Sequence, residues 1–157
     1  MSLPPFQALL EVNRADVYRF LVASVGSSEA DDCFQETCIA ALRAYPRLRR
    51  ATNLRAWLFR IAERKAIDAQ RARRRRPHPV ERLPEAAMVA PRPSDNSEPA
   101  LWAAVRRLPA KQRTAVVCRS ALGMPYSELA ELLGSTEEAA RRSVHEGLEK
   151  LRKEWSR

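Results

Sequence analysis

The chain of 157 residues carries 28 lysines and arginines against 19 aspartates and glutamates, a net charge of +9. This excess favours a polyanionic partner, although a ribosome-like or merely soluble basic protein remains the plain alternative. Arginine is abundant and only 4 residues are glycine, which favours an all-helical fold over a β-rich one.

Two amphipathic helices are predicted before residue 46. Pro4 and Pro5 suit the start of the first helix, which Gly26 ends. The sequence "SEAD" at residues 28–31 resembles a capping box that opens the second helix, and Pro46 stops that helix. The apolar stripe of the second helix is predicted to consist of Ala30, Cys33, Phe34, Cys38, Ala41, Leu42 and Tyr45.

A third, long helix is predicted from Leu54 to Arg76, after the basic loop "RLRRATN". One side of this helix carries an aromatic residue within an arginine stripe, a pattern that can stack on bases while guanidinium groups hold phosphates. The alternative is a core tryptophan beside a solvated arginine face. The side chains of this stripe are Trp57, Arg60, Arg64 and Arg71.

Residues 77–99 divide the chain, because they hold six of its 11 prolines and show no sustained periodicity. The division predicts two small helical domains, at residues 1–76 and 100–157, joined by a flexible Pro-rich linker. Residues 1–76 carry 15 basic and 8 acidic side chains, and residues 101–157 carry 11 and 7. Both domains are therefore basic.

A helix-turn-helix is predicted in the second domain. Its first helix begins at Pro125 and ends at Gly134, and Ser135 is expected to cap the next helix in a capping box with Glu138. Four pairs in this next helix place an acid four residues before a base, which stabilises helices: Glu137 with Arg141, Glu138 with Arg142, Glu146 with Lys150, and Glu149 with Lys153. Its buried stripe is predicted to be Ala140, Val144, Gly147, Leu148, Leu151 and Trp155.

Two sets of motifs resemble bacterial RNA polymerase sigma factors of the extracytoplasmic-function (ECF, group 4) type. "DDCFQET" followed by "AWLFRIAERKAID" resembles the second conserved region of that family, and "LPAKQR" with "YSELAELLG" resembles the fourth. The resemblance implies a non-enzymatic sigma factor that binds core RNA polymerase, recognises −10 and −35 promoter elements and promotes DNA melting. Its implied partners are the β′ clamp helices and β flap of polymerase, promoter DNA and an anti-sigma protein.

The resemblance also assigns roles to individual residues. For polymerase binding it implies Asp32, Gln35 and Glu36. For the −10 element it implies Arg47, Arg49, Arg50, Thr52, Asn53, Trp57, Arg60 and Arg64. For the −35 element, the groove-facing half of the last helix exposes Thr136, Glu138, Arg141, Arg142 and His145. The chain departs from the family at Arg64, often asparagine, and at Ser143 and Glu146, often arginine.

Two other classes of function compete with this interpretation. A stand-alone helix-turn-helix regulator that never contacts polymerase would leave "DDCFQET" without a role. An enzyme is disfavoured because the 2 histidines show no metal-ligand spacing and no phosphate loop or nucleophile motif is present, so no cofactor or metal is expected. Three cysteines without a CxxC motif, no signal-peptide core and no apolar run of about 20 residues predict a cytoplasmic protein without membrane insertion.

Overall fold

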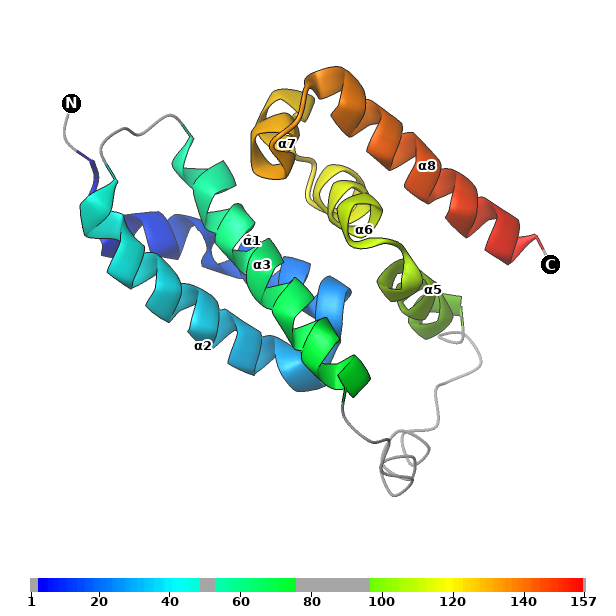
Figure 1. Cartoon of the computed structure of the whole chain (residues 1–157), viewed down its shortest axis with the longest axis horizontal. Coiled ribbons are helices and arrows are strands. Elements are labelled where there is room, and N and C mark those ends of the chain that lie inside the picture. Colours follow the sequence, from blue (N-terminus) through cyan, green and yellow to red (C-terminus); the bar gives the residue numbers. More distant parts are fainter. Residues whose placement is uncertain (1–2, 49–52, 76–96, 157) are drawn as a thin grey trace.

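The computed structural model describes residues 3–48, 53–75 and 97–156, and these residues form helices and turns without any strand. This confirms the all-helical prediction for the described part of the chain. The first domain contains α1 (Phe6–Val25), α2 (Ser27–Ala44), a short 3-10 helix η1 (Tyr45–Arg47) and α3 (Leu54–Arg75). The second contains α5 (Ser97–Arg107), α6 (Ala110–Val116), a π-helical segment η4 (Val117–Ala121), α7 (Tyr126–Leu133) and α8 (Glu137–Trp155) (Figure 1).

The first domain is a bundle of three helices that pack pairwise against one another. Its centre is formed by Phe20 of α1 and Phe59 of α3, both fully buried, whose rings meet edge to face at 5.7 Å between centroids. The predicted capping box at residues 28–31 is wrong. Gly26, at φ 90°, turns the chain within one residue and is itself the N-cap, so α2 begins at Ser27 without a side-chain cap.

In the second domain the predicted helix-turn-helix consists of α7 and α8. Gly134 adopts the left-handed conformation at φ 65° and ends α7, as its position in the sequence predicts. The N-cap of α8 is Thr136 rather than Ser135, because the Thr136 hydroxyl accepts a hydrogen bond from the Ala139 amide at 3.0 Å.

Trp155 does not belong to the buried stripe of α8, since 51% of its surface is exposed. The cause is a difference in helix length. α8 has 19 residues, whereas α6 and α7, which pack against it, have 7 and 8. The last turn of α8 therefore has too little partner surface to cover a large ring.

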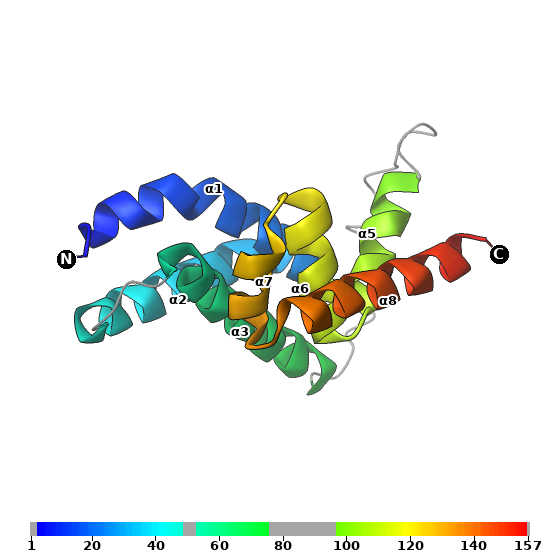
Figure 2. The ribbon, with the colours of Figure 1, turned by 90° about the horizontal axis from the view of Figure 1, so that it is seen from above.

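The two domains pack against each other. α3 of the first domain lies against α7 of the second, and α1 lies against α5 and η4 (Figure 2). We call this packing the closed arrangement. The linker prediction falls on residues 77–99, of which residues 77–96 lie outside the described part of the chain, and α5 begins at Ser97. No helix in the described ranges has the length and apolar character needed to cross a membrane.

Gly147 lies at a close contact between α8 and α6. A Cβ atom at this position would lie 2.5 Å from Cγ2 of Val116, well inside van der Waals contact. Gly147→Ala is therefore expected to destabilise the protein by about 1–3 kcal/mol, although alanine is about 1 kcal/mol better than glycine within a helix.

Val116→Ala provides the matched test of that contact, because it removes the methyl group that Gly147→Ala would strike. Chemical denaturation should show that the double variant loses less stability than the two single variants together. Strictly additive losses would show that the two helices separate freely at this point.

Candidate functional site

One candidate surface lies on α2. Asp32, Gln35 and Glu36, the predicted polymerase-binding residues, are all exposed. One and two turns further along the helix, Ile39 and Leu42 are 50% and 57% exposed. An apolar strip therefore lies next to the acidic and amide groups on the same face of α2. The prediction that Leu42 is buried is wrong, because α2 turns Ala30, Cys33, Thr37 and Ala41 toward the core instead.

Burial also explains the low reactivity of Cys33, which lies on the core side of α2. Burial, with smaller contributions from nearby carboxylates led by Glu29, raises the pKa of Cys33 to about 11. Cys33 is therefore a protonated core residue at neutral pH, because the smaller opposing effect of Lys65 does not offset burial.

A second candidate surface surrounds the start of α3. Arg47 is exposed in η1, whereas Arg49, Arg50 and Thr52 lie outside the described residues. The side-chain oxygen Oδ1 of Asn53 accepts a hydrogen bond from the Ala56 main-chain amide at 2.9 Å, which caps the start of the helix.

The aromatic and arginine side chains of the α3 stripe differ in how far they are exposed. Trp57 is half-buried and lies tilted against the Tyr45 ring, with 5.9 Å between centroids. Arg60 and Arg64 are exposed. Trp57 therefore fits neither alternative fully, because its ring packs against Tyr45 and part of its surface remains exposed.

The predicted −10 surface is partly covered by α7 in the closed arrangement. The Asn53 amide donates to Glu128 Oε2 at 3.1 Å, and Arg60 donates to the main-chain carbonyl oxygen of Glu131. A small hollow of about 120 Å³ lies beside these contacts and is lined by Leu48, Asn53, Leu54, Ala56, Trp57, Arg60 and Glu131. Two side chains expected to contact promoter DNA are thus engaged within the protein.

Arg55 joins three helices at the same point. Its guanidinium donates to Glu128 Oε1 of α7 at 2.7 Å and to Asp16 Oδ2 of α1 at 3.0 Å, and it lies 5.3 Å from the centre of the Phe59 ring. The side chains of Arg55, Asp16 and Glu128 are only 25%, 33% and 14% exposed. Such partly buried pairs are screened less than surface pairs and contribute more. Sequence analysis missed all three residues, since no local pattern connects positions 39 and 73 residues apart.

The third candidate surface is the first half of α8. Thr136, Glu138, Arg141, Arg142 and His145 are all exposed, as predicted. The Thr136 hydroxyl is used in capping, and Arg141 lies 4.6 Å from the centre of the Tyr126 ring of α7 and 3.9 Å from Glu137. Among the predicted helix pairs, Glu137 with Arg141 forms, whereas Glu149 pairs with Arg152 instead of Lys153.

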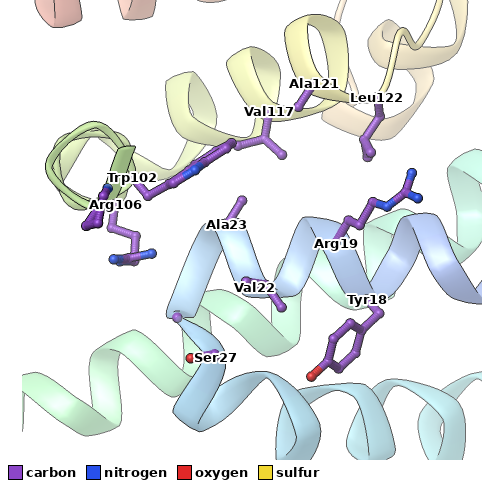
Figure 3. A pocket seen from close by; sticks show the side chains of 12 residues that line it. Tyr18, Arg19, Val22, Ala23, Ser27, Trp102, Arg106, Val117, Ala121 and Leu122 are labelled. Carbon is purple, nitrogen blue, oxygen red and sulfur yellow. The ribbon is translucent and has the colours of Figure 1, made fainter. Parts of the chain in front are cut away.

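The seam between the domains is not filled throughout. α2 and α8 lie on opposite edges of the molecule, with the seam between them (Figure 1). Between α1, α5 and η4 runs an apolar groove of about 490 Å³, into which Val22, Ala23, Trp102, Val117 and Leu122 project (Figure 3). Tight apolar packing therefore does not hold this part of the seam closed.

Comparison with known proteins agrees with this architecture. The family model "Sigma-70 region 2" matches residues 9–76, and "Sigma-70, region 4" matches residues 99–151. Together these two regions define a two-domain transcription initiation factor. The ECF RNA polymerase sigma factor SigD of Mycobacterium tuberculosis is 37% identical over 158 residues, covering 93% of this chain and 74% of SigD. ShbA, an ECF sigma factor of Streptomyces griseus, is 34% identical over 78% of this chain and 69% of its own.

The chain belongs to the ECF family of RNA polymerase sigma factors. As a member of that family it binds core RNA polymerase, recognises promoter DNA and supports transcription initiation. The fold is also similar to that of CnrH, solved with the cytosolic domain of CnrY, with a TM-score of 0.70 and 22% identity over 96% of this chain and 87% of CnrH. RpoE of Bartonella quintana, solved with the anti-sigma factor NepR, gives 0.69 and 21% over 96% of both chains.

Glu128→Gln is expected to loosen the closed arrangement, because it removes the negative charge that Arg55 meets across the seam. The half-buried pair is worth about 1 kcal/mol, so the ratio of open to closed molecules should rise about fivefold. Small-angle X-ray scattering should show a larger radius of gyration.

Glu131→Gln is the matched control for this measurement. It removes a carboxylate from the same helix but leaves the main-chain carbonyl that accepts from Arg60. If Glu131→Gln expands the molecule as much as Glu128→Gln does, the general acidity of α7 rather than the Arg55 pair holds the domains together.

Proposed function

We propose that the exposed face of α2 binds the β′ clamp helices of core polymerase. The observation that carries this proposal is the continuity of Asp32, Gln35 and Glu36 with the apolar Ile39 and Leu42 on one exposed face. An interface needs adhesive apolar area together with polar groups that select the partner. Two large apolar side chains that lie next to each other and half or more in water form a patch of the kind that marks interaction sites.

The promoter-facing roles are divided between the two domains. The start of α3, from Asn53 to Arg64, contacts the −10 element, and the exposed first half of α8 contacts the −35 element. The second domain also meets the β flap. The protein acts by binding and by distorting DNA, and it is not itself an enzyme. Its place of action is the cytoplasm, where core polymerase works.

Promoter binding requires the closed arrangement to open. Asn53 and Arg60 are hydrogen-bonded to α7, so they become available to DNA only after α7 leaves α3. Both elements must also be reached at once by domains that the closed arrangement fixes side by side. Binding of polymerase and DNA therefore selects an open form in which α3 and α7 are separate.

An anti-sigma protein is proposed as a further partner. CnrH and RpoE, which share the fold, were each solved in complex with a second protein, the cytosolic domain of CnrY and the anti-sigma factor NepR. A protein that binds this chain in the closed arrangement would keep Asn53 and Arg60 away from DNA.

The competing function is a helix-turn-helix regulator that acts without polymerase. It accounts for α7 and α8 but not for the exposed α2 face. Titration of labelled chain with core polymerase separates the two, since only a sigma factor forms a stable complex.

Asp32→Arg combined with Gln35→Ala is expected to abolish polymerase binding and leave the fold intact. Both side chains are exposed on α2 and fill no part of the core, so circular dichroism should not change. The control is Arg43→Ala, also exposed on α2 but in its last turn. Normal holoenzyme assembly by the double variant would show that this surface has another role.

Arg142→Ala is expected to reduce −35 recognition more than Glu149→Ala. Arg142 is exposed within the first two turns of α8, where a guanidinium can pair with guanine, and losing that contact costs about 1–3 kcal/mol. Glu149 pairs with exposed Arg152 and offers no donor to a phosphate.

The measurement is promoter binding by reconstituted holoenzyme with the −35 element intact and scrambled. Glu149→Ala should bind equally well or slightly better, mainly at low salt, because a charge that repels phosphate is removed. Unchanged discrimination by the Arg142→Ala holoenzyme would show that α8 does not face the groove as assigned.

A further inference from the structure

Six arginines from both domains gather at the end of the seam opposite Arg55. They line two adjoining hollows of about 330 and 370 Å³, and the Gln70 amide lies on the wall of both. The six residues, called the arginine cluster below, are Arg71, Arg73 and Arg74 of α3, Arg106 and Arg107 of α5, and Arg113 of α6.

One member of the arginine cluster is buried and incompletely satisfied. Arg113 is 2% exposed and lines the larger hollow. Its guanidinium donates to the main-chain carbonyls of Leu108 and Arg106 at 3.4 and 3.5 Å, both long contacts. Its Nε has no hydrogen-bond partner among the described residues. A buried donor without an acceptor is costly, so Arg113 keeps unused hydrogen-bonding capacity beside the larger hollow.

The guanidinium groups also repel one another across the seam. Burial, followed by the Arg73 charge, lowers the pKa of Arg106. Burial likewise lowers the pKa of Arg113, and the Arg74 charge lowers it further, against the opposing effect of Glu63. In both cases a charge from the first domain disfavours a charge of the second, so closing the domains concentrates like charge here.

The carboxylates near the arginine cluster do not balance it. Within the described part of the chain, Glu29 lies 4.0 Å from Arg73, Glu154 pairs with Arg107, and Glu63 faces Arg113. Burial raises the pKa of Glu63, against the opposing effects of Thr114 and Arg113. Three carboxylates thus face six guanidinium groups, which leaves an excess of positive charge around two hollows.

We propose that these two hollows form a binding site for a small oligophosphate anion, and that the bound anion holds the two domains closed. Guanidinium groups pair bidentately with phosphate oxygens, and several of them around one cavity match a chain of linked phosphates. Hollows of a few hundred Å³ have the size of small-molecule sites and are too small for a double helix. Exposed Arg71, Arg73, Arg74 and Arg107 give the anion access, while Arg113 supplies the buried donor.

The site couples ligand binding to closure because neither domain completes it alone. An anion that binds only the closed arrangement stabilises it by mass action. Closure keeps Asn53 and Arg60 against α7, so the anion is expected to oppose promoter engagement. The proposal for binding does not depend on the proposed promoter contacts, and only its regulatory consequence does.

An apolar groove adjoins the phosphate site and offers room for a further part of the ligand. Arg106 lines both the groove and the smaller hollow, and the Trp102 indole projects into the groove beside it (Figure 3). A nucleotide could place its phosphates among the arginines and its base in this groove. Tripolyphosphate and ATP carry the same phosphate chemistry, so comparing them distinguishes a free oligophosphate from a nucleotide.

Isothermal titration calorimetry of the full chain tests the site directly, with tripolyphosphate, ATP and a single-stranded oligonucleotide as separate ligands. Tripolyphosphate or ATP should bind with one-to-one stoichiometry, and Arg74→Gln with Arg107→Gln should weaken that binding about tenfold or more. Tighter binding of ATP than of tripolyphosphate would assign the groove to the base, and equal binding would assign phosphate alone.

The control variant, Arg43→Gln with Lys153→Gln, removes the same charge at exposed positions on α2 and α8 and should change binding less than twofold. Small-angle scattering should show that the bound anion makes the wild-type chain more compact but leaves the Arg74→Gln, Arg107→Gln chain unchanged. Binding of the oligonucleotide alone, equal losses in both variants, or binding without compaction would each overturn the proposal.

Discussion

Among the described residues, one salt bridge joins the two domains, the pair of Arg55 with Glu128, and it adds a charged contact to the packing of α3 against α7. The two domains carry 15 and 11 basic residues against 8 and 7 acidic ones, so their average charges repel. At the start of α3 this repulsion is offset, because α7 supplies an acidic group that faces a basic group of the first domain. The other terminal nitrogen of the same guanidinium donates to Asp16 of α1, and this second bond orients the Arg55 side chain.

The neighbours of this contact include two side chains, Asn53 and Arg60, that are proposed to bind promoter DNA. The Glu128 carboxylate and the Glu131 carbonyl offer acceptors to Asn53, Arg55 and Arg60, as phosphate and base edges do. On the proposed assignment of Asn53 and Arg60 to the −10 element, closure and promoter binding compete for these donors. A covalent connection gives the intramolecular acceptors a high effective concentration, yet each of these contacts is individually modest. Such a balance lets polymerase and DNA displace α7 without unfolding either domain.

The sequence predicted most of the local structure and little of the seam. Periodicity located the helices, and Gly134 located the turn, because both depend on neighbours along the chain. The predictions of burial were wrong where tertiary contacts decide it. Leu42 faces solvent, and Trp155 lies beyond the helices that pack against α8. The Glu128 contacts join residues 73 and 75 positions apart, and no single-sequence pattern encodes such a pairing.

The arginine cluster shows the same difference between local and global rules. Arg73 and Arg74 lie in the last turn of α3, and Arg106 and Arg107 lie in the last turn of α5, where each helix favours positive charge. Each pair is thus well placed in its own domain, and only closure brings the four together. The start of α3 attracts the second domain while its end repels it, so the balance along one helix sets how firmly the domains close. Any anion that enters between the arginines removes the repulsion and leaves the attraction of Arg55 for Glu128 unopposed.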